Sequence, residues 1–96
     1  MDVSLIIVNW NTRDILRDCL DSVYRETKGI SFEVIVVDNS SIDGSADMVS
    51  SEFGDVVLIE NLFNRGFGSA NNQGMKVAKG RYILLLNSDT IVLDNA

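Results

Sequence analysis

The residues near Asp38 and Asp89 carry the side chains that a site for a metal ion and a phosphate group requires. Two such carboxylates in a chain of net charge −6 would repel a phosphate unless a divalent cation lay between them. Asp89, with the oxygens of Asn87 and Ser88 beside it, offers the hard ligands that Mg²⁺ or Mn²⁺ prefers. A single carboxylate binds these ions weakly, so the phosphate oxygens of the ligand would have to complete the metal shell.

The glycine-containing segment 64–69 is a second candidate for contact with a phosphate. Gly66 and Gly68 match the first two glycines of a dinucleotide-binding fingerprint, but Asn71 occupies the third position. Met75 rather than a lysine directly follows Gly74, so a Walker loop is excluded as well. The two glycines therefore indicate either a close approach of the backbone to a ligand or a tight turn.

Trp10 is the single tryptophan and stands between two asparagines after the first apolar run. An aromatic face can stack on a planar nucleobase. The alternative is that Trp10 packs over the edge of the core, and both interpretations stay open here.

The sequence has no histidine and one cysteine, Cys19. An internal disulfide, a Cys/His zinc site and a histidine general base are therefore excluded. Chemistry in this chain must use carboxylates, amides, hydroxyls or a bound ion. Cys19 lies in an apolar stripe at helical spacing, which favours a core position over a reactive thiol.

Four apolar runs rich in valine and isoleucine predict the strands that position these side chains. The runs are continuous rather than alternating, as in strands buried on both faces of a parallel sheet. The segments between them are long enough for crossover helices. The predicted strands are Val3–Val8, Val34–Val37, Val56–Ile59 and Tyr82–Leu86.

Three helices are predicted between the strands. The first begins near Asn11, which we expect to cap it. The second follows Asp43-Gly44, where Asp43 is a candidate cap. The third extends from Gly68 to Ala78, with Gly80 as its C-terminal stop. The predicted inward-facing residues are Ile15, Leu16, Cys19, Leu20 and Val23 in the first helix and Ala46, Val49 and Phe53 in the second.

This order of elements predicts an α/β fold with three layers, built on a doubly wound, mainly parallel sheet of four strands. Such sheets bind ligands beyond the carboxyl ends of their strands. We expect the four polar segments that follow the strands to meet at one crevice. These segments are Asn9-Trp10-Asn11, Asp38-Asn39-Ser40, Asn61–Phe67 and Asn87-Ser88-Asp89.

Length and composition limit what else the chain can be. Its 96 residues, 46% of them hydrophobic, are enough for one small domain over residues 1–96. The balance of 14 acidic against 8 basic residues makes nucleic acid an unfavourable partner. The longest apolar run, Tyr82–Leu86, is too short to span a bilayer. No signal peptide is recognisable, so a cytoplasmic location is expected.

Four blocks of the sequence resemble the family 2 glycosyltransferases of GT-A fold, with the closest likeness to bacterial rhamnosyltransferase-like members. The blocks stand in the family's order and spacing and cover nearly the whole chain. The resemblance implies the N-terminal, donor-binding half-domain of a transferase for cell-wall or polysaccharide biosynthesis. The blocks are residues 3–11 (VSLIIVNWN), 36–45 (VVDNSSIDGS), 64–74 (NRGFGSANNQG) and 85–89 (LLNSD).

The resemblance implies a pyrimidine nucleotide-diphospho-sugar, UDP- or dTDP-linked, as the ligand. Val8 and Trp10 would line the pocket for the base and ribose. Asp38 would accept a hydrogen bond from the imide N–H of uracil or thymine. The loop and helix start beside the nucleotide and sugar would supply Asn64, Gly66, Gly68 and Asn72.

The resemblance also places Asn87-Ser88-Asp89 at the family's DxD-type position. Asp89, with Asn87, would coordinate the Mg²⁺ or Mn²⁺ that holds the diphosphate, and Ser88 would contact the nucleotide-sugar. Many members carry a further Asp where this chain has Asn87 and Ser88, so metal affinity without the nucleotide should be low. The catalytic base and the site for a saccharide or lipid-linked acceptor are expected beyond Ala96, so the chain alone should be inactive.

Two other interpretations stay open. A non-catalytic, flavodoxin-like module for nucleotide or metal binding would have the same topology. A receiver domain of that kind needs acidic residues after the first strand, where this chain has Asn9-Trp10-Asn11. An inactive folding fragment could form a homo-oligomer through an exposed sheet edge at Tyr82–Leu86.

Overall fold

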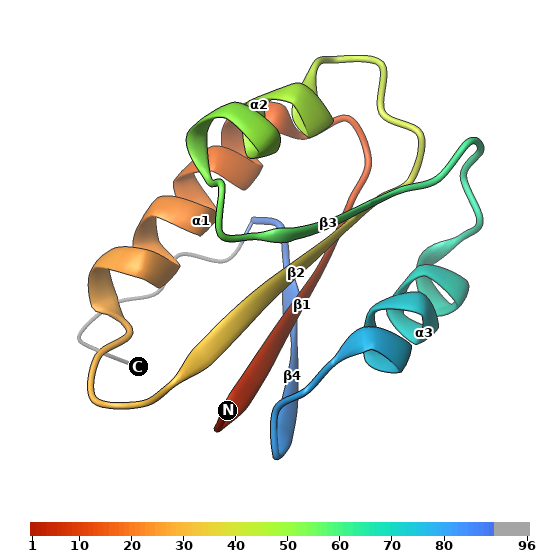
Figure 1. Cartoon of the computed structure of the whole chain (residues 1–96). Coiled ribbons are helices and arrows are strands. Elements are labelled where there is room, and N and C mark those ends of the chain that lie inside the picture. Colours follow the sequence, from red (N-terminus) through yellow and green to blue (C-terminus); the bar gives the residue numbers. More distant parts are fainter. Residues whose placement is uncertain (90–96) are drawn as a thin grey trace.

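Four parallel strands form the centre of the molecule, shown in Figure 1. The computed structural model describes residues 1–89. Within this range the strands pair in the order β3-β2-β1-β4, and every neighbouring pair is parallel. The strands are β1 (Val3–Asn9), β2 (Phe32–Asp38), β3 (Val57–Glu60) and β4 (Tyr82–Asn87).

Helices cover both faces of this sheet (Figure 1). Helices α1 (Arg13–Glu26) and α2 (Ser45–Glu52) pack on one face, and α3 (Phe67–Val77) packs on the other. Side chains alternate between the faces along each strand, so Leu5 and Ile7 join the cluster under α1, whereas Ile6 joins the cluster under α3. The predicted three-layer, doubly wound α/β fold is thus confirmed.

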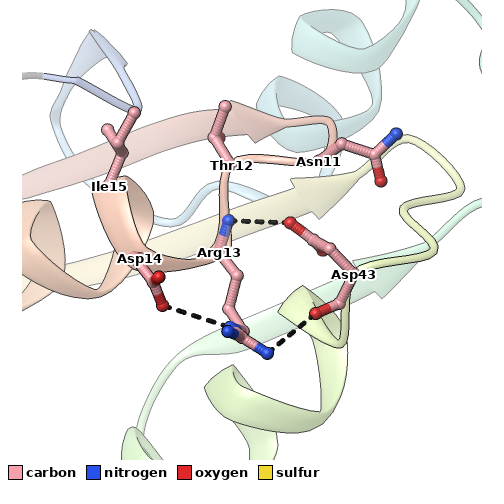
Figure 2. A pocket seen from close by; sticks show the side chains of 6 residues that line it. All are labelled: Asn11, Thr12, Arg13, Asp14, Ile15 and Asp43. Atoms are coloured by element: carbon pink, nitrogen blue, oxygen red, sulfur yellow. Dashed lines mark hydrogen bonds and ion pairs between the residues drawn. The ribbon is translucent and has the colours of Figure 1, made fainter.

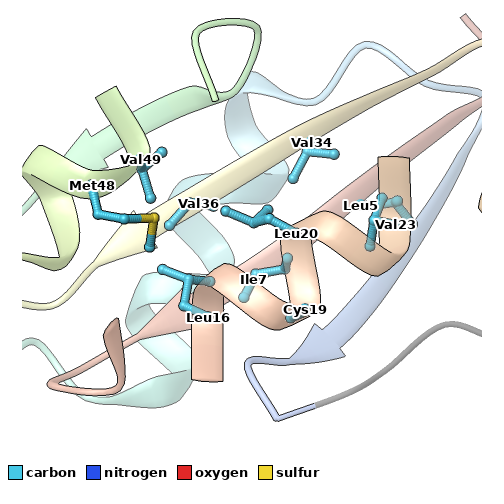
Figure 3. Packing of buried hydrophobic residues seen from close by; sticks show 10 residues of the cluster. All are labelled: Leu5, Ile7, Leu16, Cys19, Leu20, Val23, Val34, Val36, Met48 and Val49. Carbon is cyan, nitrogen blue, oxygen red and sulfur yellow. The ribbon is translucent and has the colours of Figure 1, made fainter. Parts of the chain in front are cut away.

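The larger core cluster lies between α1, α2 and the sheet (Figure 3). Leu16, Cys19 and Leu20 from α1 are fully buried, as are Val34 and Val36 from β2. The prediction that Cys19 is a core residue is confirmed, since its side chain has no exposed surface. Burial of these side chains is the main force that holds the helices on the sheet.

The two outer strands differ from the prediction that all four strands are buried on both faces. Strands β1 and β2 lie in the centre of the sheet and are largely buried, but β3 and β4 form its edges. In β4, Tyr82 is 66% exposed and Leu84 is 50% exposed. Strand β2 also begins at Phe32 rather than at Val34, because Phe32 and Glu33 pair with the start of β1.

The prediction that Asn11 caps α1 is wrong. The Asn11 backbone has a φ of 53°, and its side-chain oxygen accepts a hydrogen bond from the Ile42 amide at 2.8 Å. The residue before α1 is Thr12, whose side chain makes no capping hydrogen bond. The amide of Arg13 instead donates to the carboxylate of Asp43 at 2.9 Å, so the capping group comes from a residue 30 positions away.

Three smaller predictions about the helices also need correction. Ile15 is 47% exposed and does not belong to the buried stripe of α1. Met48 is a buried residue of α2 that the predicted inner face did not include. Gly80 does not end α3, which ends at Val77. A Cβ at Gly80 would lie 2.5 Å from the Ser4 amide nitrogen, so glycine there permits close contact with β1.

Among residues 1–89, no helix has the length and apolar character that crossing a membrane requires.

Candidate functional site

The carboxyl ends of three adjacent strands bring the predicted polar residues to one edge of the sheet. Asn9 is paired with Asp38 across β1 and β2, and Val8 is paired with Asn87 across β1 and β4. The connection leaving β1 crosses toward β2, whereas β4 joins β1 from the other side, so the strand order reverses between β1 and β4. Such a reversal is where doubly wound sheets bind their ligands.

Asp38 is a buried carboxylate, only 3% exposed, and it accepts three hydrogen bonds. The Asn9 side-chain amide and the Ser41 hydroxyl donate to Oδ1 at 2.9 and 2.6 Å, and the Ser41 backbone amide donates to Oδ2 at 3.0 Å. A carboxylate has about four acceptor positions. Asp38 therefore fixes the loop after β2 and keeps one acceptor position on Oδ2.

A chain of side-chain contacts continues from Asp38 to the end of β4. The Thr12 hydroxyl donates to Asn9 Oδ1 at 2.5 Å, and its oxygen lies 3.2 Å from Ser88 Oγ. Asn9 itself is fully buried. The ends of β2, β1 and β4 are thereby joined through one continuous polar network, and Asp38 and Asp89 lie at the same edge of the sheet.

Side-chain amides fix the loop between β3 and α3. Asn39, 2% exposed, donates to the Gly66 carbonyl at 3.2 Å and accepts from the Asn61 side chain and the Arg65 amide at 3.0 and 3.2 Å. Asn61 and Gln73 exchange two further hydrogen bonds, each of 2.8 Å. This network holds the start of α3 at the carboxyl edge of the sheet.

The two glycines of this loop have different roles. Gly66 has a φ of +83°, which favours glycine, and Asn64 Oδ1 accepts a hydrogen bond from its amide at 2.8 Å. Gly68 lies in the first turn of α3, and a Cβ there would meet nothing within 4 Å. Gly66 therefore allows the backbone to turn before α3, and Gly68 leaves open space beside the start of this helix.

The neighbouring asparagines of α3 also differ. Asn72 is exposed, whereas Asn71 is 5% exposed. The side-chain oxygen of Asn71 is buried and has no hydrogen-bond partner within residues 1–89.

Large apolar side chains are exposed in the segments that follow the strands. Trp10 is 56% exposed after β1, Phe63 is 63% exposed in the loop after β3, and Phe67, the first residue of α3, is 57% exposed. Trp10 is therefore not a core residue, and its half-exposed side chain is compatible with stacking on a base and with packing over the edge of the core. Val8 is partly buried on the α3 face of the sheet.

A surface pocket of about 410 Å³ lies at the start of α1 (Figure 2). Its walls include Arg13, whose backbone amide and guanidinium both bind Asp43. Burial by itself would raise the pKa of Asp43, but hydrogen bonds from the Ser45 side chain and from the Arg13 and Ser45 backbone amides lower the pKa below its ordinary value. Since these polar groups bind one another and no predicted ligand residue lines the pocket, it is not the predicted site.

The residues at the end of β4 fit a divalent cation only together with a ligand. Asn87, Ser88 and Asp89 provide hard oxygen donors. No group of three or more His, Cys, Asp or Glu that could hold a metal ion occurs among residues 1–89. Phosphate oxygens would have to supply the remaining ligands.

The end of β4 also contacts α1. The Cys19 thiol lies 3.9 Å from the Asn87 carbonyl oxygen. Burial of Cys19, with a smaller contribution from the charge of Asp89, raises the pKa of the thiol to about 11. Cys19 is therefore a neutral packing group and not a thiolate ligand of a metal.

The structure thus brings Asp38, Asn87, Ser88 and Asp89 to one edge of the sheet, and Asn39, which follows Asp38, binds the loop that carries Gly66. Sequence reasoning placed Asn9, Asn39 and Asn61 in the segments expected to meet here, but it did not predict the bonds that they make. It assigned no part in the site to Thr12, Ser41 and Gln73. Their abundance of amides and hydroxyls after the strands was a signal, but their pairing depends on contacts between distant segments.

Comparison with known proteins gives consistent results. The family model described as Glycosyl transferase family 2 matches residues 4–96. Poly(ribitol-phosphate) beta-glucosyltransferase of Bacillus spizizenii is 36% identical over 97 residues, which cover 96% of this chain and 15% of that protein.

Two solved structures share the fold. S. aureus TarS has a TM-score of 0.87 at 25% identity, covering 98% of this chain and 29% of that chain. The mannosyltransferase PcManGT from Pyrobaculum calidifontis, in complex with GDP-Man and Mn²⁺, has a TM-score of 0.86 at 26% identity, covering 97% of this chain and 29% of that chain. This chain therefore spans less than a third of the length of these relatives.

Proposed function

Because the chain belongs to glycosyl transferase family 2, we propose that it binds the nucleotide-diphospho-sugar donor of a glycosyltransferase. The observation that carries the proposal is the convergence of Asp38 and Asn87-Ser88-Asp89 at the reversal point between β1 and β4. This is the place where a doubly wound sheet accepts a ligand. In the longer protein, the sugar would be transferred to a saccharide or lipid-linked acceptor in cell-wall or polysaccharide biosynthesis.

The nucleoside would lie against Trp10. The half-exposed indole would offer a face on which a base can stack, and Val8 would add apolar surface to the pocket. The remaining acceptor position on Asp38 Oδ2 suits the imide N–H of uracil or thymine, which lies between two carbonyl groups. The ring N–H of guanine lies between a carbonyl and an amino group, so guanine would need a second acceptor for the amino group. We therefore propose a UDP- or dTDP-sugar as the donor. TarS has been solved with UDP and with UDP-GlcNAc, whereas PcManGT contains GDP-Man.

The diphosphate and sugar would lie between the end of β4 and the start of α3. Asp89 and Asn87 would hold Mg²⁺ or Mn²⁺ against the diphosphate, and Ser88 would contact the donor. The bound cation would neutralise the charge that develops on the diphosphate as the sugar leaves. Gly68 leaves space for the sugar, and Asn64, Gly66 and Asn72 would border it.

Isothermal titration of the 96-residue chain with UDP, dTDP and GDP, each with and without Mn²⁺, tests this proposal. We expect UDP or dTDP to bind at least tenfold more tightly than GDP, and Mn²⁺ to increase the affinity. A Trp10→Ala variant should weaken binding by about 1–3 kcal/mol because the stacking surface is lost. Ile42→Ala is the matched control, since Ile42 is 92% exposed and has no assigned role at the site.

Failure of all three nucleotides to bind a folded chain in the presence of Mn²⁺ would contradict donor binding. Equal affinity for GDP would contradict only the pyrimidine preference. Metal binding without any nucleotide would favour the flavodoxin-like module as the alternative. No structural feature of residues 1–89 specifically favours that second function.

A further inference from the structure

The hydroxyl of Thr12 lies between the end of β1 and the end of β4. It donates to Asn9 Oδ1 at 2.5 Å, and its oxygen lies 3.2 Å from Ser88 Oγ. A threonine directly before a helix ordinarily caps that helix. Thr12 makes no such bond, since its hydroxyl contacts Asn9 and Ser88 instead, and the Asp43 carboxylate binds the first amide of α1. Figure 2 shows the Thr12 side chain directed away from this Arg13–Asp43 contact.

The contact with Asp38 determines the orientation of the Asn9 side-chain amide, and with it the donor in each hydrogen bond of this network. Its Oδ1 faces the side-chain nitrogen of Asn9 at 2.9 Å and the hydroxyl of Ser41 at 2.6 Å. A carboxylate oxygen in this position accepts from both groups. The nitrogen of the Asn9 amide therefore faces Asp38, and the amide oxygen faces Thr12.

The donors and acceptors among the hydroxyls can be assigned because each hydroxyl carries a single hydrogen. Thr12 gives its hydrogen to Asn9, so it accepts from Ser88 across the 3.2 Å contact. Ser88 then has no hydrogen left for a ligand. Its oxygen presents only lone pairs to the crevice, which suit a cation or a hydroxyl of the sugar and do not suit a phosphate oxygen.

We propose that Thr12 is a positioning residue for donor binding. Its hydroxyl orients the Ser88 hydroxyl as an acceptor and joins Ser88, which follows β4, to the ends of β1 and β2. The proposal rests on the donor-binding function proposed above. It assigns a role to a residue that the sequence motifs did not single out.

Thr12→Val tests the role, because valine keeps the branched shape and removes the hydroxyl. Thr12→Ser is the matched control that keeps the hydroxyl. We expect Thr12→Val to lose about tenfold in UDP affinity in the presence of Mn²⁺ and much less in its absence, as for loss of one oriented hydrogen bond. Thr12→Ser should bind within about twofold of the wild type. Calorimetric titration, with the melting temperature of each variant, provides the measurement.

Amide NMR signals of the ligand-free chain give a readout that does not depend on the nucleotide. Thr12→Val should shift the signals of Ser88 and of the Asn9 side-chain NH₂ group, and Thr12→Ser should not. If Thr12→Val is too unstable to measure, Ser88→Ala should shift the same Asn9 signals from the other end of the contact.

Unchanged signals and unchanged UDP affinity in Thr12→Val would overturn the proposal, as would equal losses in Thr12→Val and Thr12→Ser. A wild-type chain that binds no nucleotide would contradict the proposed function. In that case the Ser88 and Asn9 signals still decide whether the Thr12 contact orients Ser88.

Discussion

Asp43 connects two helix starts and shows how single residues organise this edge of the sheet. One oxygen of its carboxylate accepts from the Arg13 amide, and the other accepts from the amide and the hydroxyl of Ser45. The amides at the start of a helix otherwise lack partners, so one carboxylate serves both α1 and α2. These bonds also fix the loop after β2, which carries the Asp38 network.

Replacement of Asp43 should therefore destabilise the fold in a pH-dependent way. We expect Asp43→Ala to lower the free energy of unfolding at pH 7 by about 1–2 kcal/mol, as for loss of a capping residue. Because the pKa of Asp43 is lower in the folded state, its contribution is complete above the ordinary value of 3.8 and is lost as the pH falls through the folded value. Urea unfolding between pH 7 and pH 3 measures the difference.

Asp21→Ala is the control for that experiment, because Asp21 is an exposed residue in the middle of α1. It should change the stability by no more than about 0.5 kcal/mol. Equal stability of Asp43→Ala and wild type at pH 7 would show that the two helix starts do not depend on this carboxylate.

At the scale of elements, glycines set how closely α3 and its following loop approach β1. A Cβ at Gly74 would lie 2.6 Å from Ile6 Cγ2, and a Cβ at Gly80 would lie 2.5 Å from the Ser4 amide nitrogen. The Gly80 amide also donates to Ser4 Oγ at 2.8 Å. These contacts fix α3 on the sheet. They thereby also fix the position of Gly66 and the loop before α3 at the proposed donor site.

Gly80→Ala should destabilise the chain by about 1–3 kcal/mol, because the added methyl group meets backbone atoms that cannot move aside cheaply. Gly54→Ala is the matched control, since a Cβ there has no atom within 4 Å. Thermal unfolding monitored by circular dichroism compares the two. If Gly80→Ala is as stable as Gly54→Ala, the backbone of β1 at Val3 and Ser4 can move to accommodate a methyl group, which would contradict this prediction.

At the scale of the whole molecule, β4 is an uncovered edge of the sheet among the described residues. Its apolar side chains are 45–66% exposed from Tyr82 to Leu85. Arg81 precedes the strand and Asp89 follows it. Antiparallel pairing with the β4 of a second copy would satisfy its free backbone groups, bring the apolar side chains of the two strands into contact and place Arg81 of each copy near Asp89 of the other.

We therefore expect the 96-residue chain to self-associate through β4 as its concentration rises. Leu84→Lys should reduce this association, because it places a charge in the pairing surface. Ile42→Lys adds the same charge at a residue that is 92% exposed and far along the chain from β4, and it should not reduce it. Sedimentation velocity over a range of concentrations measures the effect. A monomer at every concentration would remove the self-associating fragment as an interpretation.

The sequence by itself determined the order of strands and helices, the three-layer fold and the family. Continuous apolar runs identify buried parallel strands because hydrophobic burial and strand length are properties of neighbouring residues. The same reasoning located Asp38 and Asp89 at strand ends. The roles toward a donor of Val8, Trp10, Asp38, Asn64, Gly66, Gly68, Asn72, Asn87, Ser88 and Asp89, and the cytoplasmic location, stay predictions.

Only the tertiary structure decided which polar groups bind one another. The partner of the first α1 amide is 30 residues away, and the contact between Thr12 and Ser88 joins positions 76 residues apart. It also decided that Asn11 does not cap α1, that Ile15 and β4 are exposed, and that Gly80 lies against β1. Hydrogen-bond partners and exposure depend on what the fold brings alongside each residue, and no local pattern of residue types specifies that.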